Sequence, residues 1–461
     1  MPQPPKTLTP RHRSGAPERR AVPGLATRRL AVDILAAVTE RDRPLDAELD
    51  ARAATPAFRA LEIKDRALLR ALVGTTLRRL GEIDDILEEL MAKPLGDKAA
   101  RVRQILRLGA AQLLFLDIPD HAAVSLAVEL ADEDHRVGRG FKGLVNGVLR
   151  TLARARDEIL EGRDADRLNT PDWLWARWVA HYGEEITRAI ASCQRVEPYL
   201  DISVKADATR WATDLGGLLL PTGSIRLEGA GAVDKLAGFG EGAWWVQDAA
   251  AALPAKLFGD VAGLDIADLC AAPGGKTAAL AAAGARVTAV DVSAERLKRL
   301  ASNVDRLKLQ DVSTVVADLE RWEPGRQFDG VLLDAPCSAT GTIRRHPDVA
   351  LMKTETQIAD LAALQSRLLA RAADWVKPGG TLIYCTCSLE PEEGEAQIDA
   401  FLAGQPDFAL VPVAPAEIGG LAEVITPSGC LRTLPSHLAN DDPRLAGLDG
   451  FFIARLRRTP A

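Results

Sequence analysis

The sequence has no long hydrophobic run, no cysteine pair spaced for a metal and no basic excess, and each absence narrows the class of protein. No stretch of about 18 apolar residues occurs in the 461 residues, so no segment is expected to span a membrane. The six cysteines are scattered without a C-x-x-C pair. This argues against a zinc site or a disulfide framework, and favours a reduced, cytoplasmic protein. The net charge of −7 gives no general attraction to nucleic acid, so RNA binding would require local basic patches.

Residues 1–22 are rich in proline and arginine and contain no apolar core, so they do not resemble a secretory signal. We expect a disordered basic tail. A loosely held arm that binds phosphates is the alternative.

Residues 23–160 show helical periodicity and are rich in alanine. Leu30, Ile34, Leu35 and Val38 repeat on one helix face, and similar patterns later in the segment predict six or seven helices packed as a bundle. Several short motifs resemble the NusB family of RNA-binding helical domains: Asp65-Arg66-Ala67, Gly74 to Arg79, Ile118 to Ala123 and Lys142 to Arg150. This resemblance implies an N-terminal RNA-binding domain.

Residues 165–240 predict a small α+β connector domain. A helix is expected to begin at Thr170-Pro171-Asp172, with its tryptophans in the core. Alternating residues 200–205 and 224–227 predict two strands. Their basic residues, Lys205 and Arg226, could face RNA.

Residues 241–461 predict an α/β domain with a Rossmann-like parallel sheet. A glycine turn at 271–277 opens a helix, and such turns let the backbone approach a ligand closely. It has neither the Walker spacing nor G-x-G-x-x-G. Asp291 and Asp318 end the next two strands, which suits a nucleoside ligand across the sheet edge. The five expected strands are residues 264–270, 285–290, 313–317, 328–333 and 380–386.

The fourth and fifth of these strands deliver two thiols. Asp334-Ala335-Pro336-Cys337 ends the fourth strand and Cys387 follows the fifth. Because these strands are expected to be neighbours, both cysteines should flank one crevice beside Asp334. A thiol is the most nucleophilic side chain, so the pair favours covalent catalysis on a pyrimidine.

Three motifs resemble the RNA cytosine-C5 methyltransferases. They are Cys270 to Lys276, Asp334 to Ser338 with Gly341 and Arg344-Arg345-His346-Pro347, and Thr386 to Leu389. With the NusB-like front, the chain resembles the Sun/Fmu type, which methylates bacterial small-subunit rRNA. The resemblance implies a nucleophilic Cys387, release of the product assisted by Cys337, and S-adenosylmethionine bound by Cys270, Ala271, Ala272, Pro273, Gly274, Gly275, Lys276, Asp291, Asp318 and Asp334. Family members often have a glycine before the acid that matches Asp318, whereas this chain has Ala317, so the resemblance supports Asp318 less strongly than the other acids.

The implied mechanism starts with attack of Cys387 on C6, which makes C5 nucleophilic. Asp334 near N3 would stabilise the electron-rich intermediate, Lys276 is expected to contact the cytosine or Asp334, and Cys385 is expected only to pack. No metal is expected, and we expect a monomer that acts on rRNA away from membranes. The alternatives are a tRNA or DNA cytosine-C5 methyltransferase and a NusB-like RNA-binding regulator with an inactive sheet domain.

Overall fold

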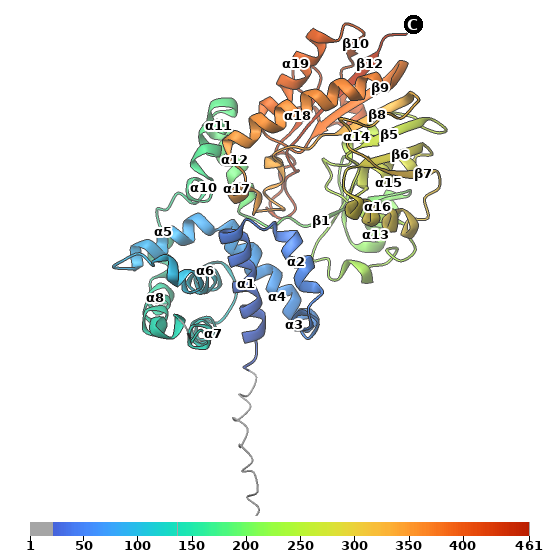
Figure 1. The fold of residues 1–461 in the computed structure, drawn as a ribbon. Helices are drawn as coiled ribbons and strands as arrows, with labels where there is room; N and C mark the ends of the chain where they lie inside the picture. Colours follow the sequence, from blue (N-terminus) through green and yellow to red (C-terminus); the bar gives the residue numbers. More distant parts are fainter. Residues whose placement is uncertain (1–21, 136, 461) are drawn as a thin grey trace, which may run out of the picture.

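The computed structural model describes residues 22–135 and 137–460, so the expected basic tail lies almost entirely outside the described residues. Three parts follow one another along the chain (Figure 1). A helical bundle, blue to cyan, lies at one end of the molecule. A sheet domain, yellow to red, lies at the other, and the green connector runs between them.

The predicted helical bundle is confirmed, and its apolar faces form one continuous core. Its elements are α1 (Leu25–Arg41), α2 (Leu45–Ala53), α3 (Pro56–Arg59), α4 (Ile63–Arg78), α5 (Leu80–Leu90), α6 (Ala100–Phe115), α7 (Asp120–Glu133), α8 (Lys142–Arg154) and α9 (Arg156–Leu160). The described part of the bundle therefore holds nine α-helices rather than six or seven. The difference arises because α3 and α9 are short helices of four and five residues.

The connector begins with three helices, α10 (Ala165–Leu168), α11 (Asp172–Tyr182) and α12 (Glu184–Gln194). The predicted strands are present as β1 (Leu200–Val204) and β3 (Ile225–Leu227). They join β2 (Leu218–Leu219) and β4 (Trp244–Val246) in an antiparallel sheet of order β2-β3-β1-β4, beside α13 (Ala208–Leu215). Because β4 belongs to this sheet, the sheet extends to residue 246, whereas the predicted connector ends at residue 240.

Arg226 does not face RNA, so this expectation is wrong. Its side chain is fully buried and forms two hydrogen bonds with Asp201, of 2.7 and 2.8 Å. A buried guanidinium needs such a partner because desolvating a charge is costly. Lys205 is also engaged, since its ammonium donates to the carbonyl of Leu307.

The third part is built on a mixed sheet with the order β10-β12-β9-β8-β5-β6-β7, in which β11 also pairs with β12. The five predicted strands are β5 (Asp265–Leu269), β6 (Arg286–Asp291), β7 (Val312–Val316), β8 (Phe328–Asp334) and β9 (Val376–Thr386). These pair in parallel. Three further strands, β10 (Phe408–Leu410), β11 (Leu431–Thr433) and β12 (Phe451–Arg458), add antiparallel pairs beside β9.

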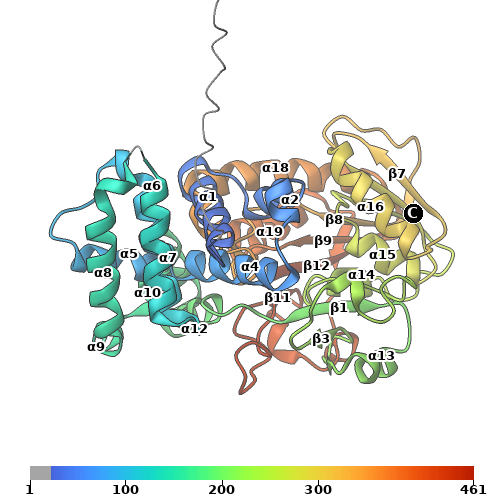
Figure 2. The same ribbon diagram turned by 90° about the horizontal axis from the view of Figure 1, so that it is seen from below.

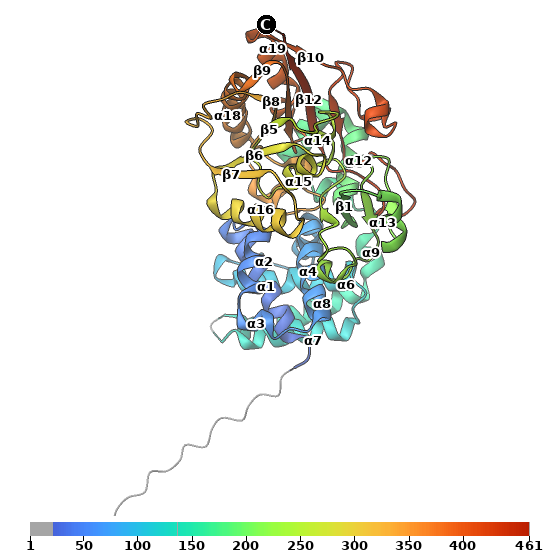
Figure 3. The same cartoon turned by 90° about the vertical axis from the view of Figure 1, so that its right-hand side faces the viewer.

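Helices cover both faces of this sheet (Figure 3). Leu333 points into a core with α18 (Glu355–Asp374) and α19 (Glu395–Gly404), whereas its neighbour Leu332 points into a core with α14 (Leu253–Lys256) and α15 (Gly275–Ala282). α16 (Ala294–Arg306) packs beside β6, and the short α17 (Val349–Met352) lies nearer the bundle. A sheet buried on both faces explains the continuous apolar runs in its strands.

The bundle contacts the sheet domain through the segment that follows the Asp334-to-Cys337 motif. The Leu45 N–H donates to Asp348 at 2.9 Å, and Arg78 donates to the carbonyl of Arg344 at 3.0 Å. His346 and Asp46 lie 3.3 Å apart. Figure 2 shows α2 and α4 toward the sheet domain, with α7 and α8 on the far side of the bundle.

Candidate active site

The two candidate catalytic cysteines meet at the carboxyl ends of β8 and β9. Their sulfur atoms lie 3.5 Å apart although 50 residues separate them in the chain. The register explains this, because Asp334 pairs with Cys385 and the Ala335 N–H donates to the Cys385 carbonyl at 2.9 Å. The predicted adjacency of the two strands is confirmed, and both thiols lie together at the same edge of the sheet.

A glycine allows the loop after Cys337 to close over β9. The Gly341 N–H donates to the carbonyl of Cys387 at 3.0 Å, and its own carbonyl accepts from Gly450 at 2.8 Å. A Cβ atom at Gly341 would lie 1.9 Å from the Gly450 carbonyl oxygen. No other residue type fits so close an approach of two backbones.

Asp334 forms a polar cluster beside the thiols. The Lys276 ammonium donates to Asp334 Oδ2 at 2.9 Å, and the Cys385 thiol donates to Oδ1 at 3.5 Å. Burial lowers the pKa of Lys276, but the ion pair with Asp334 outweighs this and raises the pKa above its usual value. Lys276 is therefore charged throughout the physiological range. Cys385 is a buried core residue that also contacts the candidate site.

The surroundings of Cys337 favour its protonated form. The hydrogen bond to Cys387 and burial raise the pKa of Cys337 well above the usual value. Cys337 therefore keeps its proton at neutral pH, which suits a proton donor better than a nucleophile. Burial likewise raises the pKa of Cys270, which lies in the glycine turn and is protonated at neutral pH.

The glycine turn has the features of a nucleoside site. It leads directly into α15, and no side chain caps the first turn of that helix. Gly274 has a φ of 103°, which favours glycine. Asp268, at the end of β5, is fully buried; its Oδ2 accepts from the Thr277 hydroxyl, but its Oδ1 has no partner among the described residues. Burial, opposed by the Thr277 hydrogen bond, raises the pKa of Asp268 to about 7.

The other two strand-end acids differ from each other. Asp291, the last residue of β6, is buried and accepts hydrogen bonds from the backbone N–H groups of Ala272 and Ser293, and the bond from Ala272 connects it to the glycine turn. Arg296 lies 3.2 Å from the same carboxylate. Asp318, after β7, is half exposed and accepts only a local backbone N–H in the described structure.

Sequence reasoning missed the buried charges that hold the loop after Cys337. Arg344 donates to Asp449 and Asp248 at 2.8 and 3.0 Å, and Arg345 donates to Asp248 and Asp201. These hydrogen bonds connect the loop to the connector sheet and to the segment that immediately precedes β12. The adjacent arginines Arg344 and Arg345 were the one sequence feature that could have indicated this network. Their acidic partners could not be identified, because they lie about 100 or more residues away in the chain.

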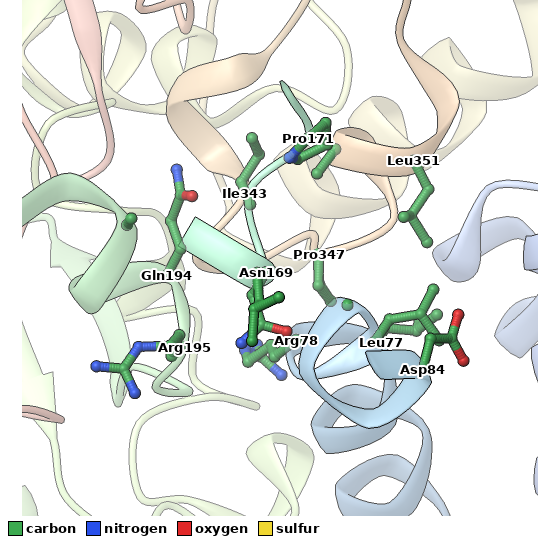
Figure 4. Close-up of a pocket in the computed structure, with 15 residues that line it drawn as sticks. Leu77, Arg78, Asp84, Asn169, Pro171, Gln194, Arg195, Ile343, Pro347 and Leu351 are labelled. Carbon is green, nitrogen blue, oxygen red and sulfur yellow. The ribbon is translucent and has the colours of Figure 1, made fainter. Parts of the chain in front are cut away.

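A separate cavity of about 220 Å³ lies where the bundle, the connector helices and the loop after Cys337 meet (Figure 4). Leu77 and Arg78 line it from α4, Asn169 and Arg195 from the connector, and Pro347 from the sheet domain. None of the residues that line it is a predicted site residue. The cavity is therefore distinct from the place where the cysteines meet.

A doubly wound sheet with a glycine turn after its first strand and acids at the ends of the next strands is typical of S-adenosylmethionine-dependent methyltransferases, and the family comparison assigns the chain to this class. Family comparison makes this more specific. The model described as 16S rRNA methyltransferase RsmB/F matches residues 260–457, and the NusB family model matches residues 25–154. These matches, together with relatives that are 36–40% identical over most of their length, show that the chain belongs to this RsmB/F methyltransferase family.

The similarity extends over almost the whole chain. A protein of Cronobacter sakazakii named "Ribosomal RNA small subunit methyltransferase B" is 36% identical, covering 93% of this chain and 98% of that protein. One of the same name from Sodalis glossinidius is 40% identical over 86% of this chain and 90% of its own. The crystal structure of the protein PH0851 is 26% identical, has a TM-score of 0.71, and covers 96% of this chain and 100% of that one. No helix in residues 22–135 and 137–460 is both long and apolar enough to cross a bilayer.

Proposed function

We propose that this protein transfers a methyl group to C5 of a cytosine in small-subunit rRNA through a covalent bond between Cys387 and C6. The observation that carries the proposal is the 3.5 Å approach of two thiols beside Asp334. The relatives named for the small ribosomal subunit support the choice of RNA, and the free state of all six cysteines supports a reducing, cytoplasmic setting. The NusB-like bundle would help to bind the RNA.

Cys387 is the proposed nucleophile because the resemblance gives that role to the cysteine of the Thr386-to-Leu389 motif, and because Cys337 keeps its proton at neutral pH. Addition of the Cys387 sulfur to C6 breaks the C5–C6 double bond and makes C5 electron-rich. After C5 has been methylated, its proton leaves to a base and the Cys387–C6 bond breaks, which restores the aromatic ring. Cys337, with its sulfur 3.5 Å from that of Cys387, lies close enough to assist this elimination.

Asp334 and Lys276 would hold the base and balance its charge. Asp334 is the last residue of β8, and the ammonium of the buried Lys276 side chain lies 2.9 Å from its carboxylate. A preorganised pair of this kind stabilises charge that develops on the pyrimidine ring, because its dipoles need not reorganise during the reaction.

The residues of the glycine turn fit S-adenosylmethionine. The unpartnered Asp268 Oδ1, the uncapped start of α15 and the buried Asp291 are suited to hold an amino-acid moiety and a ribose. When bound, S-adenosylmethionine supplies an electrophilic methyl group. Arg296, whose half-exposed side chain pairs with Asp291 and donates to the Ala272 carbonyl, would have to move for ribose hydroxyls to reach the Asp291 carboxylate. Asp318 would contribute from β7.

The release of tritium tests this chemistry. A small-subunit rRNA transcript labelled with [5-³H]cytidine should release one tritium to water for each methyl group transferred, because the methyl group replaces the C5 hydrogen. A tRNA pool and a large-subunit transcript serve as controls. Methyl transfer without tritium release would refute the C5 chemistry, and faster release from tRNA would refute the choice of substrate.

A further inference from the structure

The residues that immediately follow the two cysteines share one buried carboxylate. Ser338 follows Cys337 and Ser388 follows Cys387, and both serines are fully buried. The Ser338 N–H donates to Glu393 Oε1 at 2.9 Å, and the hydroxyls of both serines donate to Glu393 Oε2. The two hydroxyl oxygens also lie 3.0 Å apart. Glu393 therefore links the two cysteine loops from behind.

Glu393 is itself fixed to the sheet and to a helix. Its backbone carbonyl accepts from the Tyr384 hydroxyl at 2.9 Å and from Thr386 at 3.1 Å, both on β9. Gln365 of α18 donates to Glu393 Oε1 at 3.0 Å and to the Pro336 carbonyl at 2.8 Å. The carboxylate is thus held on the β9 side and reaches across to the loop that follows β8.

The chemistry of this cluster is unusual for a buried acid. Glu393 is fully buried, yet no arginine or lysine pairs with it in the described part of the chain. Its side chain instead accepts from two hydroxyls, one backbone N–H and one amide. Hydrogen bonds to a charged acceptor are about twice as strong as neutral ones, so this set can hold a carboxylate in the core. A carboxylate is also the group that accepts from several donors at once.

We propose that Glu393 is a positioning residue that fixes the two cysteine loops relative to each other, so that both sulfur atoms meet the same base. This inference rests on the proposed function. The two loops leave different strands, and the side chain of Glu393 bonds the residue next to each sulfur at 2.5 Å, whereas the Thr340 hydroxyl lies 3.5 Å from each of the same two serines. Displacement of a reacting group by about 1 Å can cost roughly 100-fold in rate.

The test uses the full-length protein in a Cys337→Ala background, in which the covalent protein–RNA complex should accumulate. Glu393→Gln keeps the shape of the side chain, but directs an amide donor at groups that already donate. We expect the single-turnover rate of complex formation to fall about 10- to 100-fold, with the Kd for RNA before trapping and the Kd for S-adenosylmethionine changed less than about twofold. Glu392→Gln is the matched control, because Glu392 is the adjacent residue but half exposed and paired with Arg177.

The outcomes separate the inference from the function on which it rests. If the Cys337→Ala parent traps no RNA, the covalent chemistry is wrong. If the parent traps RNA and Glu393→Gln traps it equally fast, the positioning role is overturned. Should Glu393→Gln fail to fold, the Ser338→Ala/Ser388→Ala double variant decides: slower trapping with unchanged cofactor affinity supports the role, and trapping at the parent rate overturns it.

Discussion

Replacing Lys276 by methionine removes the only cation that pairs with Asp334 in the described structure while keeping most of the buried volume. The side chain of Lys276 is 9% exposed and its ammonium lies 2.9 Å from Asp334, whose side chain is 30% exposed and keeps its contact with Cys385. Removing one partner of a fully buried ion pair costs about 3–5 kcal/mol. Water that reaches Asp334 reduces this cost. We therefore expect the variant to lose about 1.5–3 kcal/mol of transition-state stabilisation, the range for a hydrogen bond to a charged group.

This free energy corresponds to a loss of roughly 10- to 150-fold in kcat/KM. The assay is the initial rate of tritiated methyl transfer to the rRNA transcript. Because the ion pair raises the pKa of Lys276, the ratio of the wild-type rate to the variant rate should stay constant between about pH 6 and 9. Lys298→Met is the control, since Lys298 is an exposed lysine on α16 paired with Glu295. A Lys276→Met enzyme with a rate within twofold of the wild type would refute the reasoning.

Three further predictions concern stability. Gly341→Ala should destabilise the protein by about 1–3 kcal/mol in urea unfolding and should lower methyl transfer, because the added carbon overlaps a backbone oxygen. Gly147→Ala is the control, since a Cβ atom there meets open space. Equal stability of the two variants would contradict the prediction. Arg226→Met removes the bidentate partner of the buried Asp201, which keeps its hydrogen bond from Arg345, and should cost about 1.5–3 kcal/mol; a loss under about 0.5 kcal/mol would contradict the buried pairing. The raised pKa of Asp268, about 7 in the folded protein against 3.8, predicts that the contribution of this residue to stability falls by about 3–4 kcal/mol as the pH rises from 4 to 8. The difference in unfolding free energy between the wild type and Asp268→Asn should therefore change by this amount, and parallel pH profiles would refute the assignment.

The strands that carry the candidate site were predictable because each is a short apolar run bounded by turns or by a strand-end acid. β8 ends at Asp334, as its sequence indicates, and the pairing of β8 with β9 follows from the parallel order expected of such a sheet. The meeting of Cys337 and Cys387 is a consequence of that order. The antiparallel strands β10, β11 and β12 have no comparable signal, because their pairing partner is set only by the tertiary structure.

Buried charges were the main failure of prediction. Arg226 looks like a solvent-facing residue of an alternating strand, and Glu393 lies in an acidic run between Glu390 and Glu395 that is typical of a surface. Glu390 is also fully buried, where it accepts from the indole of Trp178 at 2.9 Å. Charged residues enter a core only when distant donors reach them, and those donors cannot be identified from local sequence.

The most direct test of the proposed mechanism separates the two cysteines on a denaturing gel with labelled rRNA and S-adenosylmethionine. If Cys387 attacks C6 and Cys337 assists release, Cys337→Ala should accumulate a protein–RNA band that survives SDS. Cys387→Ala and the double variant should show no band. A band with Cys387→Ala instead would reverse the two roles, and no band with either single variant would contradict covalent catalysis.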